Sequence, residues 1–175
     1  MAPFKNKSIK GNLYSLGHLE PFIFSLATDE AVYSVEVSFG LHCFTEALNG
    51  SHTSDLLYTH QGERRAFSVE RYELSKSLPD LIRSLGNRTV YWSERSDFFV
   101  LRDVTSNNGK RPHLVFFSAI RSAKERVDVR LSVNSAYFKP GMSQWAAPVK
   151  FATLITAVAK GTALAHGPKQ RIKRK

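Results

Sequence analysis

Arginine and tyrosine side chains gather in one short segment of this sequence, and their chemistry points to a phosphate-bearing partner. The segment runs from Gly62 to Tyr72 and holds Arg64, Arg65 and Arg71. A guanidinium group donates paired hydrogen bonds to a phosphate, and a tyrosine ring stacks on an unpaired base. We therefore expect this segment to form part of a surface that binds nucleic acid.

Arginines also alternate with aromatic residues between residues 88 and 102. Aromatic side chains on one face of a strand can stack on the bases of a single strand. The last seven residues add five cations, which would bind any polyanion in a salt-dependent way. We expect nucleic acid to be the partner, with RNA slightly favoured over DNA. The residues expected to contact it are Arg64, Arg65, Arg71, Tyr72, Arg88, Arg95, Arg102, Lys169, Arg171, Lys173, Arg174 and Lys175.

A metal-independent endoribonuclease is the alternative function. This reaction needs a base for the ribose 2′-hydroxyl, an acid for the leaving oxygen and a cation for the phosphate. The candidate catalytic residues are His60, His113, Arg130 and Tyr137. Binding and cleavage both remain open on the sequence, because no motif specific to one catalytic mechanism is present.

Metal and cofactor chemistry has little support in the residue spacing. The patterns CxxC, HExxH and GxxxxGK[ST] are absent, and so is an EF-hand loop. His42 and Cys43 are neighbours, so on a strand they would point to opposite faces and could not share an ion. We interpret Cys43 as a small buried apolar residue rather than as a nucleophile. No metal and no cofactor are expected.

Charge is unevenly distributed along the 175 residues, whose net charge is +10. No lysine or arginine occurs between Gly11 and Glu63, where seven carboxylates lie, whereas the rest of the chain is basic. Such a distribution predicts that one part of the fold meets a polyanion and another faces away from it. A further alternative is that the acidic N-terminal hairpin docks a basic protein, or a second copy of the chain, through an exposed strand edge.

The elements that must position these residues follow from the hydrophobic periodicity. Two alternating runs separated by Asp29 and Glu30 predict a β-hairpin. Leucines and isoleucine between residues 74 and 85 predict two short helices or one kinked helix, beginning after Ser68 and again near Pro79. A period of two then predicts four strands with short links, and an apolar run predicts a last helix. The expected strands span residues 22–28, 31–39, 88–93, 97–103, 114–120 and 126–134, and the last helix spans 149–160.

This order of elements predicts an α+β fold. We expect a single antiparallel sheet, formed by the N-terminal hairpin and a four-strand meander, packed against two or three helices. Residues 1–12 are interpreted as a basic flexible arm, residues 13–168 as a single domain and residues 169–175 as a basic disordered tail. A chain of this length can bury a substantial core.

Two local patterns resemble known proteins. Helices followed by an antiparallel meander, over residues 68–137, are similar in architecture to the barnase/RelE type of small ribonuclease, which implies a toxin-like endoribonuclease. The segments Phe39–Thr45 and Gly62–Lys76 resemble segments of small uncharacterised bacterial proteins of the mobile-element type. That second resemblance implies no particular function.

The apolar runs are far shorter than the ~20 residues that a membrane-spanning helix needs. The first residues are polar and basic, without the apolar core of a signal peptide. The single cysteine favours a reducing compartment, because it has no partner for an internal disulfide. We therefore expect a cytoplasmic protein that does not contact a membrane.

Overall fold

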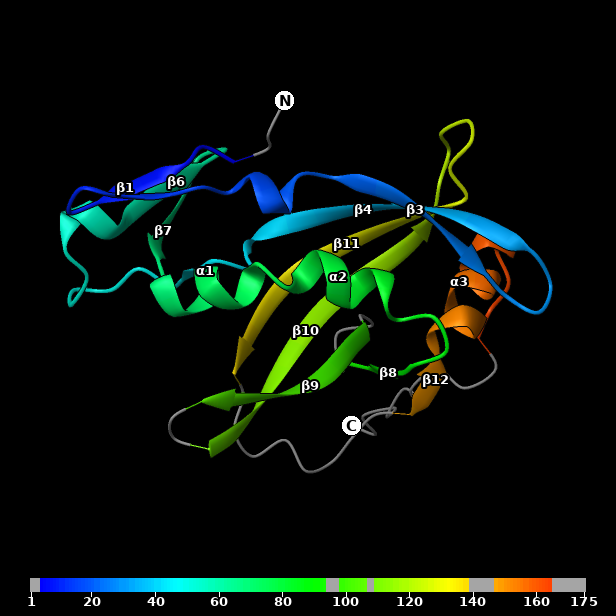
Figure 1. Ribbon diagram of the computed structural model, residues 1–175. Helices are drawn as coiled ribbons and strands as arrows, with labels where there is room; N and C mark the ends of the chain where they lie inside the picture. The colour runs from blue at the N-terminus through cyan, green and yellow to red at the C-terminus, as the bar shows by residue number, and fades with distance from the viewer. Residues whose placement is uncertain (1–3, 94–97, 107–108, 139–146, 165–175) are drawn as a thin grey trace, which may run out of the picture.

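The computed structural model describes residues 4–93, 98–106, 109–138 and 147–164. Strands dominate these ranges and form three sheets, of two, seven and three strands (Figure 1). The expected fold of one antiparallel sheet is therefore wrong in the number of sheets. It is also wrong in strand direction, because β4 (Val32–His42) and β11 (Val129–Phe138) run parallel. A parallel pair needs a long connection, and here the small sheet, two helices and three further strands supply it.

The seven-stranded sheet contains both the N-terminal hairpin and the strands of the expected meander. Its strand order is β12-β8-β9-β10-β11-β4-β3, so β3 and β12 are its edges. β11 thus lies in the interior, between its antiparallel neighbour β10 and the parallel β4. The remaining strands are β3 (Phe22–Ala27), β8 (Thr89–Trp92), β9 (Phe98–Ser106), β10 (Gly109–Arg121) and β12 (Pro148–Lys150).

The start of the chain is folded where a flexible arm was expected. Phe4 and Ile9 are 5% and 7% exposed, and the Phe4 ring lies 4.9 Å from the ring of Phe44. Lys10 and Gly11 both have positive φ, as a tight type I′ hairpin turn requires. The burial of these two apolar side chains holds the segment in place. It forms the two-stranded sheet of β1 (Lys7–Ile9) and β2 (Asn12–Tyr14), which the 3₁₀ turn η1 (Gly17–Leu19) follows.

The three-stranded sheet is built from the polar stretch that follows β4. Its order is β5-β7-β6, and Gln61 and Gly62 form the turn between β6 and β7 with positive φ. Tyr58 and Phe67 turn their rings toward Phe44, which makes this sheet continuous with the core. The elements are β5 (Thr45–Glu46), the 3₁₀ turn η2 (Ser54–Leu56), β6 (Leu57–His60) and β7 (Glu63–Phe67).

The expected helices are confirmed. Ser68 precedes α1 (Val69–Ser75), Pro79 lies in the first turn of α2 (Leu78–Arg83), and α3 (Phe151–Lys160) ends at Gly161 with positive φ. Figure 1 shows α1 and α2 lying across one face of the large sheet. None of the helices in the described ranges is long and apolar enough to cross a membrane.

The two faces of the large sheet differ sharply in composition. Side chains at alternate positions of β4, β10 and β11, among them Val37, Phe117 and Leu131, are fully buried in the core. The opposite face, here called the outer face, is polar at its centre. Its residues pair across the strands as Glu36 with Arg130 and Ser38 with Ser132. Arg130 in turn lies opposite Ile120 on β10, which is 56% exposed.

Candidate functional site

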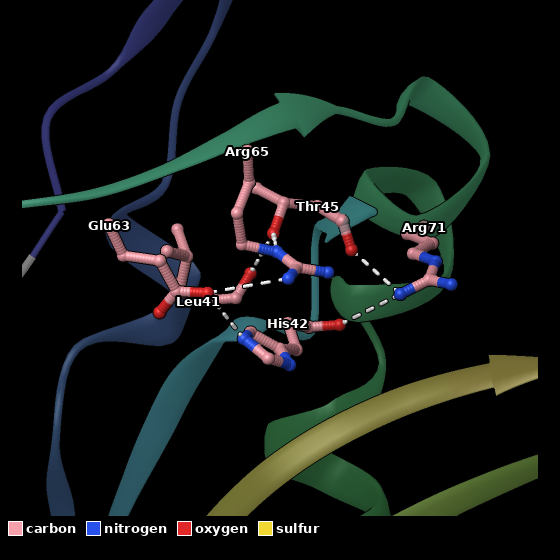
Figure 2. Close-up of polar contacts among 6 residues, drawn as sticks. All are labelled: Leu41, His42, Thr45, Glu63, Arg65 and Arg71. Atoms are coloured by element: carbon pink, nitrogen blue, oxygen red, sulfur yellow. Dashed lines mark hydrogen bonds and ion pairs between the residues drawn. The ribbon is translucent and has the colours of Figure 1, made fainter. Parts of the chain in front are cut away.

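Because β4 and β11 run parallel, their carboxyl ends lie at the same end of the large sheet. His42 at the end of β4 is in register with Ser135 of β11, and Tyr137 follows two residues later. The region beyond the ends of parallel strands is a common place for binding sites. Here the neighbouring elements β5, β7 and α1 bring further polar side chains to the same place (Figure 2).

Gly40 allows the two strands to approach closely just before this end. A Cβ atom at Gly40 would lie 2.8 Å from the carbonyl oxygen of Asn134 and 3.3 Å from that of Val133. The register of β11 against both neighbours shifts at the same place, which marks a bulge. A bulge redirects the side chains beyond it. Gly40 and the bulge together therefore set the direction of the Tyr137 side chain.

Thr45 contacts Leu41, Arg65 and Arg71 through its hydroxyl and its carbonyl group. Its buried hydroxyl donates to the carbonyl of Leu41 at 2.8 Å and accepts a hydrogen bond from Nε of Arg65, also at 2.8 Å. Its carbonyl accepts a 2.7 Å hydrogen bond from Nη1 of Arg71, which also donates to the carbonyl of His42 at 3.4 Å (Figure 2). One backbone turn therefore fixes two guanidinium groups.

A half-exposed carboxylate joins the first arginine to a histidine. Oε1 of Glu63 lies 2.9 Å from Nε2 of His42 and 3.3 Å from Nη1 of Arg65. The hydrogen bond from His42 is the main reason why the pKa of Glu63 is below its usual range. Arg65 is thus partly neutralised, and its side chain is only 15% exposed.

The second arginine has a different environment. The Arg71 guanidinium lies 5.4 Å from the centre of the Tyr137 ring, and Tyr137 stacks on Phe116 at 5.3 Å with an interplanar angle of 20°. No carboxylate of the described residues lies within ion-pair distance of Arg71. Burial lowers the pKa of Arg71. The carboxylate of Glu46 opposes this shift, as do Tyr137 and Glu70 to a smaller extent, whereas the nearby Arg65 cation adds to it. We call His42, Thr45, Glu63, Arg65, Arg71 and Tyr137 the corner site.

The candidate catalytic residues do not come together. His113 is fully buried on β10 with its ring 5.4 Å from that of Phe138, and the His60 ring packs 4.9 Å from Phe4. Arg130 lies near the start of β11, where its Nε is 3.5 Å from Glu36. Seven steps along the strand, roughly 20 Å, separate it from Tyr137. Only Tyr137 of the four contributes to the corner site.

The residues expected to bind nucleic acid are divided among several surfaces. Arg65 and Arg71 meet in the corner site, whereas Arg64, their neighbour, is an exposed residue of β7. Tyr72 packs in the core, 5.1 Å from Tyr14. Arg88 is exposed before β8, and Arg102 belongs to β9, but its side chain is not described. Arg95, Lys169, Arg171, Lys173, Arg174 and Lys175 lie outside the described residues.

The acidic and basic halves of the sequence are not segregated in space. Glu36 of the N-terminal hairpin lies 2.6 Å from Nζ of Lys124 and also pairs with Arg130. Glu30 at the hairpin turn pairs with Lys160 of α3. The hairpin therefore neutralises cations of the C-terminal half. The interpretation that the acidic segment faces away from the basic one is corrected accordingly.

Sequence reasoning missed His42, Thr45 and Glu63 as members of one site. The sequence pattern draws attention to His42 only through its neighbour Cys43, which the structure places in the core without solvent exposure. The Cys43 thiol lies 3.5 Å from the carbonyl of Val133, and burial raises its pKa to about 12. Polar residues directly after a strand were the available signal, since such positions often carry function. Throughout the described ranges, no three His, Cys, Asp or Glu side chains gather as metal ligands would.

Comparison with known proteins finds a bacterial relative. Protein YjaZ of Escherichia coli (strain K12) is 30% identical over 109 residues, which are 60% of this chain and 59% of that protein. The match thus spans less than two thirds of the relative's length. No solved structure matches the chain, so the architectural resemblance to barnase/RelE-type ribonucleases gains no support. The model of the YjaZ family matches residues 6–159, which is most of the sequence, and the chain therefore belongs to the YjaZ family.

Proposed function

We propose that this protein binds nucleic acid, with RNA favoured over DNA, and that the corner site holds a phosphate of the bound strand. The single observation that carries the proposal is the state of Arg71. Its guanidinium is partly buried, forms no ion pair with a carboxylate of the described residues and has a lowered pKa because burial outweighs the attraction of the carboxylates of Glu46 and Glu70. A cation in this state is stabilised by an anion that enters the site.

The contacts of Arg71 leave part of its hydrogen-bonding capacity for a ligand. Nη1 donates to two backbone carbonyls and thereby fixes the side chain, while the contacts recorded for the described residues do not involve Nη2. Arg65 contacts the same residue, Thr45, through the side-chain hydroxyl, so a second guanidinium is fixed on the same backbone turn. A phosphate with its several oxygen acceptors suits two fixed guanidinium groups.

The neighbouring aromatic pair supports a nucleic acid rather than a free phosphate. Phe116 and Tyr137 stack on each other on β10 and β11, directly beside Arg71. Aromatic and guanidinium planes on a sheet are the groups on which proteins stack unpaired bases. The proposed ligand is therefore a single strand, held by one phosphate at the arginines and by a base at the aromatic edge.

The proposal concerns binding and does not include cleavage. A ribonuclease would need its base, acid and phosphate-holding cation around one bond. His113 is enclosed in the sheet, and Arg130 lies at the opposite end of β11 from Tyr137. The ribonuclease alternative thus finds no assembled site among these residues.

The test compares two variants that remove one arginine each. Fluorescence anisotropy with a labelled single-stranded RNA would measure affinity for the full chain, for Arg71→Gln and for Arg130→Gln. The Arg130→Gln variant is the matched control, because it also removes one guanidinium charge, but from the start of β11, far from the corner site. We expect Arg71→Gln to weaken binding about tenfold or more and to reduce the salt slope by about 0.7, as for the loss of one phosphate contact.

Both variants keep the C-terminal basic residues, so binding by those residues affects them equally. Equal affinities for the two variants would assign RNA binding to general charge and would refute the corner site. No measurable RNA binding by the full chain would refute the function itself. A duplex of the same sequence tests strandedness, and we expect it to bind more weakly.

A further inference from the structure

The strand β3 forms one edge of the large sheet (Figure 1), and no strand of the described residues pairs with its outer side. Its six residues, Phe22–Ala27, include no charged residue and no proline. Natural proteins usually protect such an edge with lysine, proline, a bulge or a covering element, because open edges pair with other strands. Ile23 on the outer face is 58% exposed, and Val32 on the neighbouring strand is 66% exposed.

The register with β4 shows which backbone groups of β3 point outward. Thr28 donates its N–H to the carbonyl of Ala31 at the hairpin turn, 2.9 Å away. Hydrogen-bonded and non-bonded pairs alternate along an antiparallel ladder. Ile23, Ser25 and Ala27 therefore belong to non-bonded pairs, and their N–H and C=O groups face away from β4.

An independent contact supports this assignment. Ser34 lies opposite Ser25, and its own N–H and C=O bond to Asp128 on the other side of β4. The groups of Ser34 thus point away from β3, as the alternation requires. Within the described residues, the outward N–H and C=O groups of Ile23, Ser25 and Ala27 have no hydrogen-bond partner.

We propose that two copies of this chain associate by antiparallel pairing of β3 with β3, so that their large sheets become continuous. A twofold axis at Ser25 would place Ser25 opposite Ser25 of the second copy and Ile23 opposite its Ala27. In this register Ile23, Ser25 and Ala27 of one strand form hydrogen-bonded pairs with Ala27, Ser25 and Ile23 of the other. All six outward N–H and C=O groups of each strand are therefore used. The surface is self-complementary, as a twofold dimer requires.

The same register accounts for the exposed apolar side chains. Val32 lies opposite Ala27 within one copy, and Ile23 lies opposite Glu36. In the dimer, Ile23 of the second copy would stand beside Ala27, which already neighbours Val32. Two apolar rows would form, related by the axis, and each would remove an isoleucine and a valine from water.

The self-complementarity of this register favours a second copy over an unrelated strand, because the same outward groups and the same apolar side chains meet on both sides of the axis. The strand pair itself is free of charge, since Phe22–Ala27 includes no charged residue.

The first test is the oligomeric state of the full chain. Sedimentation velocity over a hundredfold range of concentration, at physiological ionic strength, should show a reversible shift from the 19.7 kDa monomer to a dimer. Ser25→Lys places two ammonium groups at the axis, where like charges repel, and should raise the dimer dissociation constant at least about tenfold. Thr59→Lys, on an exposed residue of β6, is the matched control and should leave the dimer intact.

A second test reads the register directly. Ser25→Cys should give a covalent dimer with a short bis-maleimide, whereas Thr59→Cys should not, and the buried Cys43 should stay unreactive in both. A chain that remains monomeric throughout the range would overturn the proposal. So would a dimer that Ser25→Lys leaves unchanged, or equal cross-linking of the two cysteine variants. If Ser25→Lys loses the native circular dichroism spectrum, the cross-linking result alone decides.

Discussion

At the scale of single residues, the buried thiol of Cys43 makes a prediction about pH. Burial raises its pKa from the ordinary value of 9.0 to about 12. Between these values the unfolded chain releases the proton and the folded chain keeps it, so the free energy of unfolding decreases as pH rises. The expected loss approaches about 1.4 kcal/mol per pH unit above pH ~9.5.

Urea unfolding at several pH values between about 8 and 11 would measure this loss. Cys43→Ala removes the titrating group, and its free energy of unfolding should fall less steeply with pH than that of the unaltered protein. The absolute stability of the variant is not the readout, because the smaller side chain also leaves a cavity. Equal slopes for the two proteins would show that Cys43 does not titrate in this range.

At the scale of elements, the close approach of β4 and β11 depends on a glycine. Alanine at Gly40 would place Cβ 2.8 Å from the backbone oxygen of Asn134, which cannot move without moving β11. We expect Gly40→Ala to reduce the free energy of unfolding by about 1–3 kcal/mol, as for overpacking elsewhere. It should also weaken RNA binding, because the same contact directs Tyr137 into the corner site.

The matched control is Gly50→Ala, since a Cβ at Gly50 meets nothing within 4 Å and the residue has no positive φ. That variant should be as stable as the unaltered protein, or slightly more stable through reduced entropy of the unfolded chain. Thermal unfolding of both variants gives the comparison. A Gly40→Ala protein as stable as the control would mean that the backbone of β11 can shift at its bulge with little cost in free energy.

At the scale of the whole molecule, ion pairs connect segments that are far apart in the sequence. Glu36 has a side chain only 21% exposed and contacts both Lys124 and Arg130. We expect Glu36→Gln to cost about 0.5–1 kcal/mol of stability at low salt, and less at high salt, where exposed charges are screened. Asp80→Asn, which removes a carboxylate that is 89% exposed, should have almost no effect. Urea unfolding at two salt concentrations would test this, and a salt-independent loss would contradict an electrostatic cause.

This pairing also changes the meaning of the net charge of +10. Lys124, Arg130 and Lys160 face carboxylates of the N-terminal hairpin, so they are poor candidates for binding a polyanion. Arg71 has no such partner among the described residues, and its position decides where a phosphate is expected. A count of charges along the chain does not make this distinction.

The sequence by itself determined the local elements. The alternation in residues 31–39, the spacing of leucines after Ser68 and the turn residues between strands depend on neighbours within a few positions. For this reason the hairpin of β3 and β4, both early helices and α3 were predicted close to their observed bounds. Residue type alone also predicted Arg71 as a nucleic-acid contact and Tyr137 as a candidate catalytic residue, but not the contact between them.

Only the tertiary structure decided which strands are neighbours and which side chains meet. β4 and β11 pair over a separation of more than ninety residues, and no local pattern encodes that contact or its parallel direction. The folded N-terminal segment likewise depends on a distant partner, Phe44, for the burial of Phe4. Side chains of the corner site come from β4, β5, β7, α1 and β11, and pairing across the whole chain assembles them. Hydrophobic periodicity predicts which face of a helix or strand is buried, whereas a site depends on long-range packing. For this reason only the structure shows that Arg71 and Arg65 lie in one site and that Arg130 lies at the far end of its strand.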